Sequence, residues 1–251
     1  MKPILDQKIV LVTGAGAGNG AAIAKGLAGH GARVIVTDIV QAGANETADA
    51  IRAAGSEAWT YMMDVADLDA CHAIAARIAS DIGPIDVLVN NAGVLRRDSI
   101  DDPTAREAWD LCMDVNATSV FNTTIAFLPH LRATRGNIVN MASIVAFVAA
   151  RTFPGYAASK AAVVAASRAF AQKLAPDGIR VNVIAPGPFA TPMTATTRAN
   201  NAAGSYYEDR VLLGRFAQPE EIVGPVAFIA SDMATFVTGA VLPVDGGLLA
   251  H

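Results

Sequence analysis

Three polar residues of this chain stand at spacings that suit proton transfer. Tyr156 and Lys160 are four positions apart in the segment G-Y-A-A-S-K, and Ser143 precedes the tyrosine by thirteen positions. On a helix, positions i and i+4 share one face, so the lysine ammonium can lie near the phenol oxygen. A free tyrosine has a pKa of about 10, and lowering it by about 3 units needs roughly 4 kcal/mol of preferential phenolate stabilisation. A nearby ammonium and an oxidised nicotinamide can supply that together, so we predict that Tyr156 transfers a proton.

Ser143 ends the apolar run I-V-N-M-A-S. From a strand end its hydroxyl can hold a substrate oxygen by a hydrogen bond, which positions the attached carbon for hydride transfer. The sequence therefore predicts a constellation of Ser143, Tyr156 and Lys160 around one reactive carbon.

A glycine-rich segment, T-G-A-G-A-G-N-G, runs from Thr13 to Gly20 between a β-branched run and a helix-like stretch. Glycines allow a tight turn and bring backbone N–H groups against a pyrophosphate, whose charge the positive end of the following helix attracts. We therefore predict that a dinucleotide contacts the loop residues Thr13, Gly14, Gly16, Gly18, Asn19 and Gly20.

Asp38 closes the second β-branched run, about 20 residues after the glycines, where a carboxylate accepts hydrogen bonds from the adenosine ribose hydroxyls. A 2′-phosphate at that place meets a like charge, and neither Ala17 in the loop nor Ile39 after the aspartate supplies a cation to relieve it. The expected cofactor is NAD in preference to NADP, with Ile39 beside the adenosine.

Two further strand ends carry residues suited to a cofactor. Asp64 and Val65 follow the third run and can bracket the adenine ring, the aspartate by a hydrogen bond and the valine by packing. The cluster N-N-A-G places Asn91, Ala92 and Gly93 after the fourth run, where backbone must pass close to the ligand.

Short apolar runs alternate with helix-length segments along the whole chain. The predicted strands are residues Ile9 to Thr13, Val34 to Thr37, Ala58 to Met62, Val87 to Asn90, Asn137 to Met141, Val181 to Ile184 and Val241 to Val244. Such alternation is typical of an α/β fold with one doubly wound parallel sheet and helices on both faces. We expect residues 1–251 to form a single domain that binds the dinucleotide and carries the catalytic residues.

The segment from Thr191 to Leu213 breaks this rhythm because it is polar and rich in Ala, Thr and Asn. An insertion of that length is either disordered or a lid, and it follows a strand end on the side where open parallel sheets bind ligands. We expect a mobile substrate loop there.

The composition excludes several other classes of protein. With 251 residues, 53% hydrophobic and 17% charged, the chain can bury a sizeable core, and its net charge of −4 argues against nucleic-acid binding. It has neither an N-terminal apolar signal nor a run of about 18 apolar residues, which predicts a soluble, cytoplasmic protein away from the membrane. Cys71 and Cys112 fit neither a disulfide framework nor a metal-ligand spacing, so no metal is expected.

Taken together, these motifs resemble those of the short-chain dehydrogenase/reductase family over nearly the whole chain. In order they are Thr13 to Gly20, Asp38, Asp64, Asn90 to Gly93, Asn116, Ser143, Tyr156 with Lys160, Pro186 with Gly187, and Thr191. The resemblance implies a Rossmann-like seven-stranded sheet of order 3-2-1-4-5-6-7, a nicotinamide cofactor and a homotetramer. It also implies that Asn116 holds a water next to Lys160, that Lys160 binds the nicotinamide ribose, and that residues 191–213 are the variable substrate loop.

The segment P-G-P-F-A-T resembles the part of the family that seats the nicotinamide carboxamide. By this resemblance Pro186, Gly187 and Thr191 contact the carboxamide, and Phe189 contacts the ring. Asn19 departs from the family pattern, which more often has an aliphatic residue there, so it can alter the nicotinamide pocket.

The reaction expected from these residues is the NAD-dependent interconversion of a secondary alcohol, such as a polyol or a cyclic alcohol, and a ketone. One alternative is reduction of a 3-oxoacyl thioester on a carrier protein, which usually draws on NADPH and needs a basic docking surface. Asp38 argues against the use of NADPH. Arg132 and Arg135 partly supply a basic docking surface, while Asp177 works against it. A nucleotide-sensing regulator without catalysis is a third possibility, and the complete Ser, Tyr and Lys set disfavours it.

The substrate itself is less well specified by the sequence. Five residues could line an apolar pocket: Ile144, Val145, Phe153, Met193 and Tyr206. Arg96 or Arg97 could reach a carboxylate or a polyol, although residues of these types more often belong simply to the core or the surface.

Overall fold

The computed structural model describes residues 3–149 and 153–250, and a seven-stranded sheet runs through it. The strands are β1 (Ile9–Thr13), β2 (Arg33–Asp38), β3 (Ala58–Met62), β4 (Val87–Asn90), β5 (Asn137–Met141), β6 (Arg180–Pro186) and β7 (Val241–Val244). All neighbouring strands are parallel, and their order is β3-β2-β1-β4-β5-β6-β7. The predicted Rossmann-like sheet and its strand order are confirmed.

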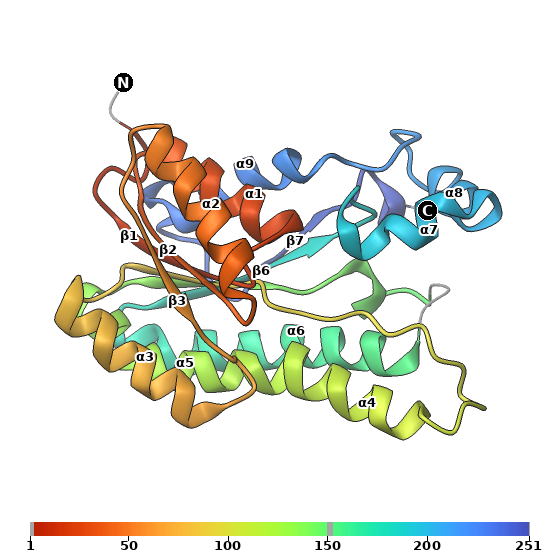
Figure 1. The fold of residues 1–251 in the computed structure, drawn as a ribbon, viewed down its shortest axis with the longest axis horizontal. Coiled ribbons are helices and arrows are strands. Elements are labelled where there is room, and N and C mark those ends of the chain that lie inside the picture. Colours follow the sequence, from red (N-terminus) through yellow and green to blue (C-terminus); the bar gives the residue numbers. More distant parts are fainter. Residues whose placement is uncertain (1–2, 150–152, 251) are drawn as a thin grey trace.

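Helices cover both faces of this sheet, as the parallel crossovers require (Figure 1). On one face lie α1 (Gly18–Gly29), α2 (Gln41–Ala53) and α9 (Val223–Ala230). On the other lie α3 (Leu68–Asp81), α4 (Ala105–Met113), α5 (Ser119–Thr134) and α6 (Pro154–Leu174). A π-helical turn, η1 (Asp114–Thr118), joins α4 to α5.

The central strands are mostly apolar because both of their faces are buried. In β1, Val10 and Val12 pack into the core that also contains Leu27 of α1. Leu11 points the other way and packs with Phe127 of α5. Alternate residues of a strand point to opposite faces, so only a strand covered on both sides has this pattern.

Two strands are longer than the sequence predicts. Strand β2 gains Arg33 and Asp38, which pair with Ile9 of β1 and Met62 of β3. Strand β6 gains one residue before and two after its predicted range, and ends at Pro186. Pairing depends on backbone groups, so a strand can continue through polar residues that a search for apolar runs leaves out.

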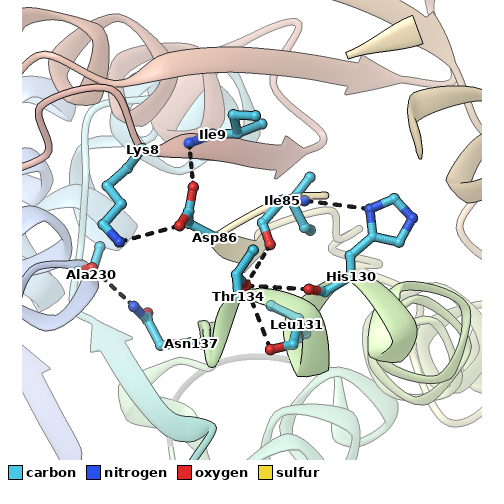
Figure 2. A network of polar contacts seen from close by, with 9 residues as sticks. All are labelled: Lys8, Ile9, Ile85, Asp86, His130, Leu131, Thr134, Asn137 and Ala230. Carbon is cyan, nitrogen blue, oxygen red and sulfur yellow. Dashed lines mark hydrogen bonds and ion pairs between the residues drawn. The ribbon is translucent and has the colours of Figure 1, made fainter. Parts of the chain in front are cut away.

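Polar contacts fix the amino-terminal edge of the sheet, as Figure 2 shows. Asp86, just before β4, accepts a hydrogen bond at 2.8 Å from the backbone N–H of Ile9. His130 of α5 accepts one from the N–H of Ile85 at 3.3 Å, and Thr134 donates one to the Ile85 carbonyl at 2.9 Å. These bonds join β1, β4 and α5 at the amino-terminal ends of the strands, which leaves the carboxyl ends for the ligand site.

Residues 191–213 are largely helical, which the sequence prediction of an irregular loop did not foresee. The segment contains the turn η4 (Pro192–Thr194) and the helices α7 (Ala195–Ala199) and α8 (Asn201–Glu208). Asn200 caps α8 by accepting a hydrogen bond from the N–H of Ala203 at 3.1 Å. The Ala-rich composition and this cap favour helix here. Both helices lie beside the C-terminus at one end of the molecule (Figure 1).

Candidate active site

A cavity of about 560 Å³ opens at the carboxyl ends of the strands. Its walls come from the glycine-rich loop after β1, the segments that follow β2 to β6, helix α6 and the helical segment after Thr191. Open parallel sheets bind ligands at this edge, where β1 has β2 on one side and β4 on the other.

Most of the predicted site residues line this one cavity. They are Gly14, Gly18, Asn19, Gly20, Asp38, Ile39, Asp64, Val65, Asn91, Ala92, Gly93, Ser143, Tyr156, Lys160, Pro186, Gly187, Phe189 and Thr191. Three others do not line it but hold lining residues in place: Thr13 and Asn116 are buried behind the wall, and Gly16 lines a neighbouring pocket.

Thr13 joins the ends of β1 and β4. Its hydroxyl oxygen accepts hydrogen bonds from the backbone N–H groups of Asn91 and Ala92, both at 3.0 Å. The Asn91 side chain in turn donates to the carbonyls of Thr13 and Gly14 at 2.9 and 3.0 Å. Gly14 has φ +60°, and a Cβ atom there would lie 2.7 Å from the Ala92 Cα. Only glycine fits at this close approach.

The Asp38 carboxylate is fixed at the edge of the cavity by two backbone groups. The N–H of Gly16 donates to Oδ2 at 2.9 Å, and the N–H of Val40 donates to Oδ1 at 2.9 Å. Among the described residues that line the cavity, Lys160 is the only lysine or arginine, and it belongs to the catalytic set rather than to the Asp38 end. No described residue therefore supplies a lining cation beside the Asp38 carboxylate.

Helix α6 brings the catalytic candidates together. Lys160 is buried, and its Nζ donates a hydrogen bond to the Met141 carbonyl at 3.0 Å and lies 5.9 Å from the centre of the Tyr156 ring. Ser143 follows β5, accepts a bond from the N–H of Val145 at 3.4 Å, and its side chain lies close enough to the Tyr156 hydroxyl to lower the pKa of that phenol. The serine thus caps a short turn and also reaches the phenol.

Burial dominates the electrostatics of Tyr156 and Lys160. Burial raises the pKa of Tyr156 to about 12, and the hydrogen bond with Ser143 only partly offsets this. Burial also lowers the pKa of Lys160 to about 8. The predicted lowering of the tyrosine pKa is therefore not a property of these side chains alone, because desolvation penalises the phenolate more than they stabilise it.

Asn116 fixes the segment that passes the lysine. Its Oδ1 accepts from the N–H of Val94 at 2.7 Å, while its Nδ2 donates to the Val94 carbonyl and to Ser159 Oγ, both at 3.0 Å. A Cβ on Gly93 would lie 3.0 Å from Asn116 Oδ1 and 3.4 Å from Lys160 Nζ. The amide thus contacts protein atoms beside the lysine, and the predicted water-holding role remains a prediction.

The predicted substrate residues are partly confirmed as cavity residues. Ile144, Val145 and Met193 line the cavity. Phe153 instead packs against Ala108 and Cys112 in a separate cluster.

In α8, Tyr207 lines the cavity where the sequence analysis had chosen its neighbour Tyr206. With no cap identified, the helix phase of this segment was unknown, and adjacent positions point in different directions.

Neither arginine of the pair lines the cavity. Arg96 forms an ion pair with Asp98 at 2.9 Å. Arg97 donates to the Met193 carbonyl at 3.2 Å and to Thr197 Oγ1 at 2.7 Å, so it ties the loop after β4 to the helical segment that covers the cavity.

The sequence analysis missed several residues of the cavity wall. They include Met63, Val94, Leu95, Leu111, Val115, Thr194, Thr197 and Phe216. Val94 and Leu95 directly follow N-N-A-G and could have been found from that motif. Leu111 on α4 and Phe216 carry no local signal, because only packing brings them to the cavity.

Within residues 3–149 and 153–250, no helix is long and apolar enough to cross a membrane. The same residues contain no group of three or more His, Cys, Asp or Glu side chains that could hold a metal ion.

Comparisons with known proteins agree with this geometry. Residues 14–249 match the family model described as enoyl-(acyl carrier protein) reductase. The chain is 38% identical to the 3-oxoacyl-acyl-carrier-protein reductase FabG of Thermotoga maritima, over 98% of this chain and 99% of that protein. It is 39% identical to the cis-4-hydroxycyclohexanecarboxylate dehydrogenase of Sinomonas cyclohexanicum, over 97% of each protein.

Among solved structures, a gluconate 5-dehydrogenase from Burkholderia cenocepacia, in complex with NADP and tartrate, superposes with a TM-score of 0.94. It is 34% identical, and the match covers 100% of this chain and 98% of that one. The chain therefore belongs to the short-chain dehydrogenase/reductase family and is an oxidoreductase that acts on CH–OH groups.

Proposed function

We propose that this protein is an NAD-dependent oxidoreductase that interconverts a small secondary alcohol, such as a polyol or a cyclic alcohol, and its ketone. The observation that carries the proposal is the meeting of Ser143, Tyr156 and Lys160 in the cavity that the glycine-rich loop also lines. The first gives a hydrogen bond, the second a titratable hydroxyl and the third a buried cation. A proton and a hydride can be moved at one carbon only where such groups converge.

In this proposal Ser143 holds the substrate oxygen and Tyr156 takes the hydroxyl proton during oxidation, or returns it during reduction. A bound nicotinamide dinucleotide supplies the hydride carrier and, when oxidised, a positive charge close to the phenol. Moving the Tyr156 pKa from about 12 to about 7 requires roughly 7 kcal/mol of phenolate stabilisation. In this proposal Lys160 supplies part of it, since its Nζ lies 5.9 Å from the centre of the Tyr156 ring.

The residues of the cavity fit a dinucleotide. The amino terminus of α1 begins at Gly18 in the glycine-rich loop, so its free N–H groups suit a pyrophosphate. The close approach of Gly14 to Ala92 excludes any side chain at position 14, so the glycine-rich loop and the end of β4 pack directly together at the cavity wall. We propose that the predicted cofactor residues of this wall hold the dinucleotide, supported by Thr13 and Gly16.

The preference for NAD rests on Asp38. Its carboxylate is held in place, and none of the residues 3–149 and 153–250 puts a lysine or arginine into the cavity wall at that end. A 2′-phosphate would meet an uncompensated like charge there. The gluconate 5-dehydrogenase structure holds NADP, so coenzyme selectivity can differ between close relatives and must be measured for this chain.

We also propose that the chain is a single cytoplasmic domain that assembles as a homotetramer. Large apolar side chains on its surface support assembly: Phe121 is 54% exposed and Phe236 is fully exposed. Exposed apolar surface of this kind commonly marks an interface.

Reduction of 3-oxoacyl groups on a carrier protein is the second candidate, favoured by the similarity to the Thermotoga maritima reductase. Arg132 and Arg135, the basic residues considered for docking the acidic carrier protein, do not support this candidate. Arg132 forms an ion pair with Asp177 at 2.8 Å, which neutralises its charge. Arg132 and Arg135 precede β5, whereas Ser143 follows it, so within one chain they lie at the opposite end of the strand from the site.

The test is a screen of polyols, cyclic alcohols, their ketones and an acetoacetyl thioester with both coenzymes. Turnover is measured as the change in NADH or NADPH absorbance. NAD-coupled turnover of alcohols or ketones supports the proposal. Activity confined to the thioester would establish the second candidate, and NADH binding without any turnover would point to a regulator.

A further inference from the structure

We infer that the substrate carries hydrocarbon around its reacting carbon, as an aliphatic or cyclic secondary alcohol without further hydroxyl groups does. This inference narrows the proposed function and rests on it. It follows from what lines the part of the cavity beyond the cofactor residues.

Outside the cofactor motifs and the catalytic residues, most of the described residues that line the cavity are apolar. They include Leu95, Leu111, Ile144, Val145, Met193 and Phe216. They come from the loop after β4, helix α4, the turn after β5, and the segments after β6. Elements far apart in the chain thus supply the same kind of surface.

The threonine hydroxyls of this region already have protein partners. Thr194 Oγ1 accepts from the N–H of Thr191 at 3.1 Å and donates to the Phe189 carbonyl at 2.5 Å. Thr197 Oγ1 accepts from Arg97 at 2.7 Å. The ring of Tyr207 packs edge-on against Phe216, with 6.2 Å between ring centres. Within the part of the wall that the structure describes, few side chains thus remain as partners for hydroxyl groups other than the reacting one.

This wall discriminates between substrates by desolvation. A hydroxyl group that leaves water without finding a partner weakens binding by about 5-fold or more. A buried methylene strengthens binding by about 4-fold. A polyol therefore loses binding affinity at each of its additional hydroxyl groups, whereas a cycloalkane ring gains affinity at each methylene in the same positions.

Two of the partly exposed side chains that line the cavity also favour a hydrocarbon substrate. Leu111 is 38% exposed and Met193 is 42% exposed, although both line the cavity. A hydrocarbon substrate that contacts them removes this apolar surface from water. Met193 is also the residue whose carbonyl accepts from Arg97, so its position is tied to the loop after β4.

The experiment compares cyclohexanol with myo-inositol, which has the same ring and a hydroxyl on every carbon. We expect kcat/KM with NAD to be at least about 100-fold higher for cyclohexanol. Equal or faster turnover of inositol or gluconate would overturn the inference and leave the proposed alcohol oxidation intact. The absence of turnover of every alcohol and ketone with either coenzyme would overturn both.

A matched pair of variants distinguishes the effect of a polar side chain in the cavity wall from the effect of the same substitution elsewhere on the surface. Met193→Gln should raise the KM for cyclohexanol about 4-fold or more and change kcat by less than about 2-fold. Met233→Gln, at a methionine that is 65% exposed and outside the cavity, should change neither. Both side chains are partly exposed, so the variants are expected to fold. An unchanged KM in Met193→Gln, with Leu111→Asn giving the same result, would overturn the inference.

Discussion

The side-chain amide of Asn116 donates a hydrogen bond to Ser159 Oγ at 3.0 Å, between two residues that are both buried. Ser159 lies between Tyr156 and Lys160 on α6 and itself donates to the Tyr156 carbonyl at 2.8 Å. Asn116 lies on the π-helical turn and also holds Val94 of the loop after β4. The bond thus joins the loop beside the cofactor wall to the helix that carries the catalytic candidates.

Ser159→Ala should lower the free energy of unfolding by about 1–3 kcal/mol, because it leaves one N–H of the buried Asn116 amide without a partner. Urea unfolding measures this change. The matched control is Ser205→Ala on α8, at an exposed serine, which should change stability by less than about 0.5 kcal/mol. Equal losses in the two variants would show that the bond does not contribute.

Tyr156→Phe should reduce kcat at least about 100-fold, the scale of lost acid–base catalysis, and leave NADH affinity nearly unchanged. Steady-state kinetics and fluorescence titration with NADH measure the two quantities. Tyr206→Phe is the control, since Tyr206 is absent from the cavity wall and should retain activity. Near-normal turnover of Tyr156→Phe would refute the role of this hydroxyl in proton transfer.

Asp38→Ser combined with Ile39→Arg should shift the ratio of kcat/KM for NADP over NAD by at least about 10-fold towards NADP. The change replaces a like charge by a cation at the 2′-phosphate position. Asp38→Asn removes the charge but keeps a single acceptor oxygen, so it retains only one of the hydrogen bonds from Gly16 and Val40. A selectivity ratio that neither variant moves would mean that the ribose lies elsewhere.

His130 should make the protein less stable in acid. Burial lowers the pKa of its imidazole, although a backbone hydrogen bond to Ala75 partly raises it. The imidazole is protonated near pH 6.5 in the unfolded chain but only at a lower pH in the folded protein. The contribution of neutral His130 to the free energy of unfolding is therefore fully present above pH 6.5 and is lost as the pH falls below it.

Urea unfolding between pH 5 and 8 measures this dependence. His130→Asn keeps an acceptor near the N–H of Ile85 and removes the titration, so its stability should change less between those pH values. An identical pH dependence in the two proteins would assign the acid sensitivity to other groups.

Features that depend on neighbours in the chain could be predicted from the sequence. The glycine-rich loop between β1 and α1, the apolar strands and the i, i+4 pair of Tyr156 and Lys160 are of this kind. The strand ends of β2 and β6 were less accurate, because pairing with neighbouring strands extended them. The helices after Thr191 were missed because the Asn200 cap was not identified.

Other features arise only when distant segments meet. The Asn116 to Ser159 bond spans 43 positions, and the contact of Arg97 with Thr197 spans 100. The raised pKa of Tyr156 reflects burial by surrounding elements, so spacing along the chain cannot reveal it. The same holds for Leu111, which reaches the apolar wall through the packing of α4.

The sequence by itself determined the family, the order of elements and the residues able to do the chemistry, because local periodicity and motif spacing encode them. The tertiary structure decided which of those residues face the cavity, which support it from behind, and what surrounds the reacting carbon. The physical reason is that desolvation and packing depend on every atom within a few ångströms, and most of those atoms belong to segments far away in the chain.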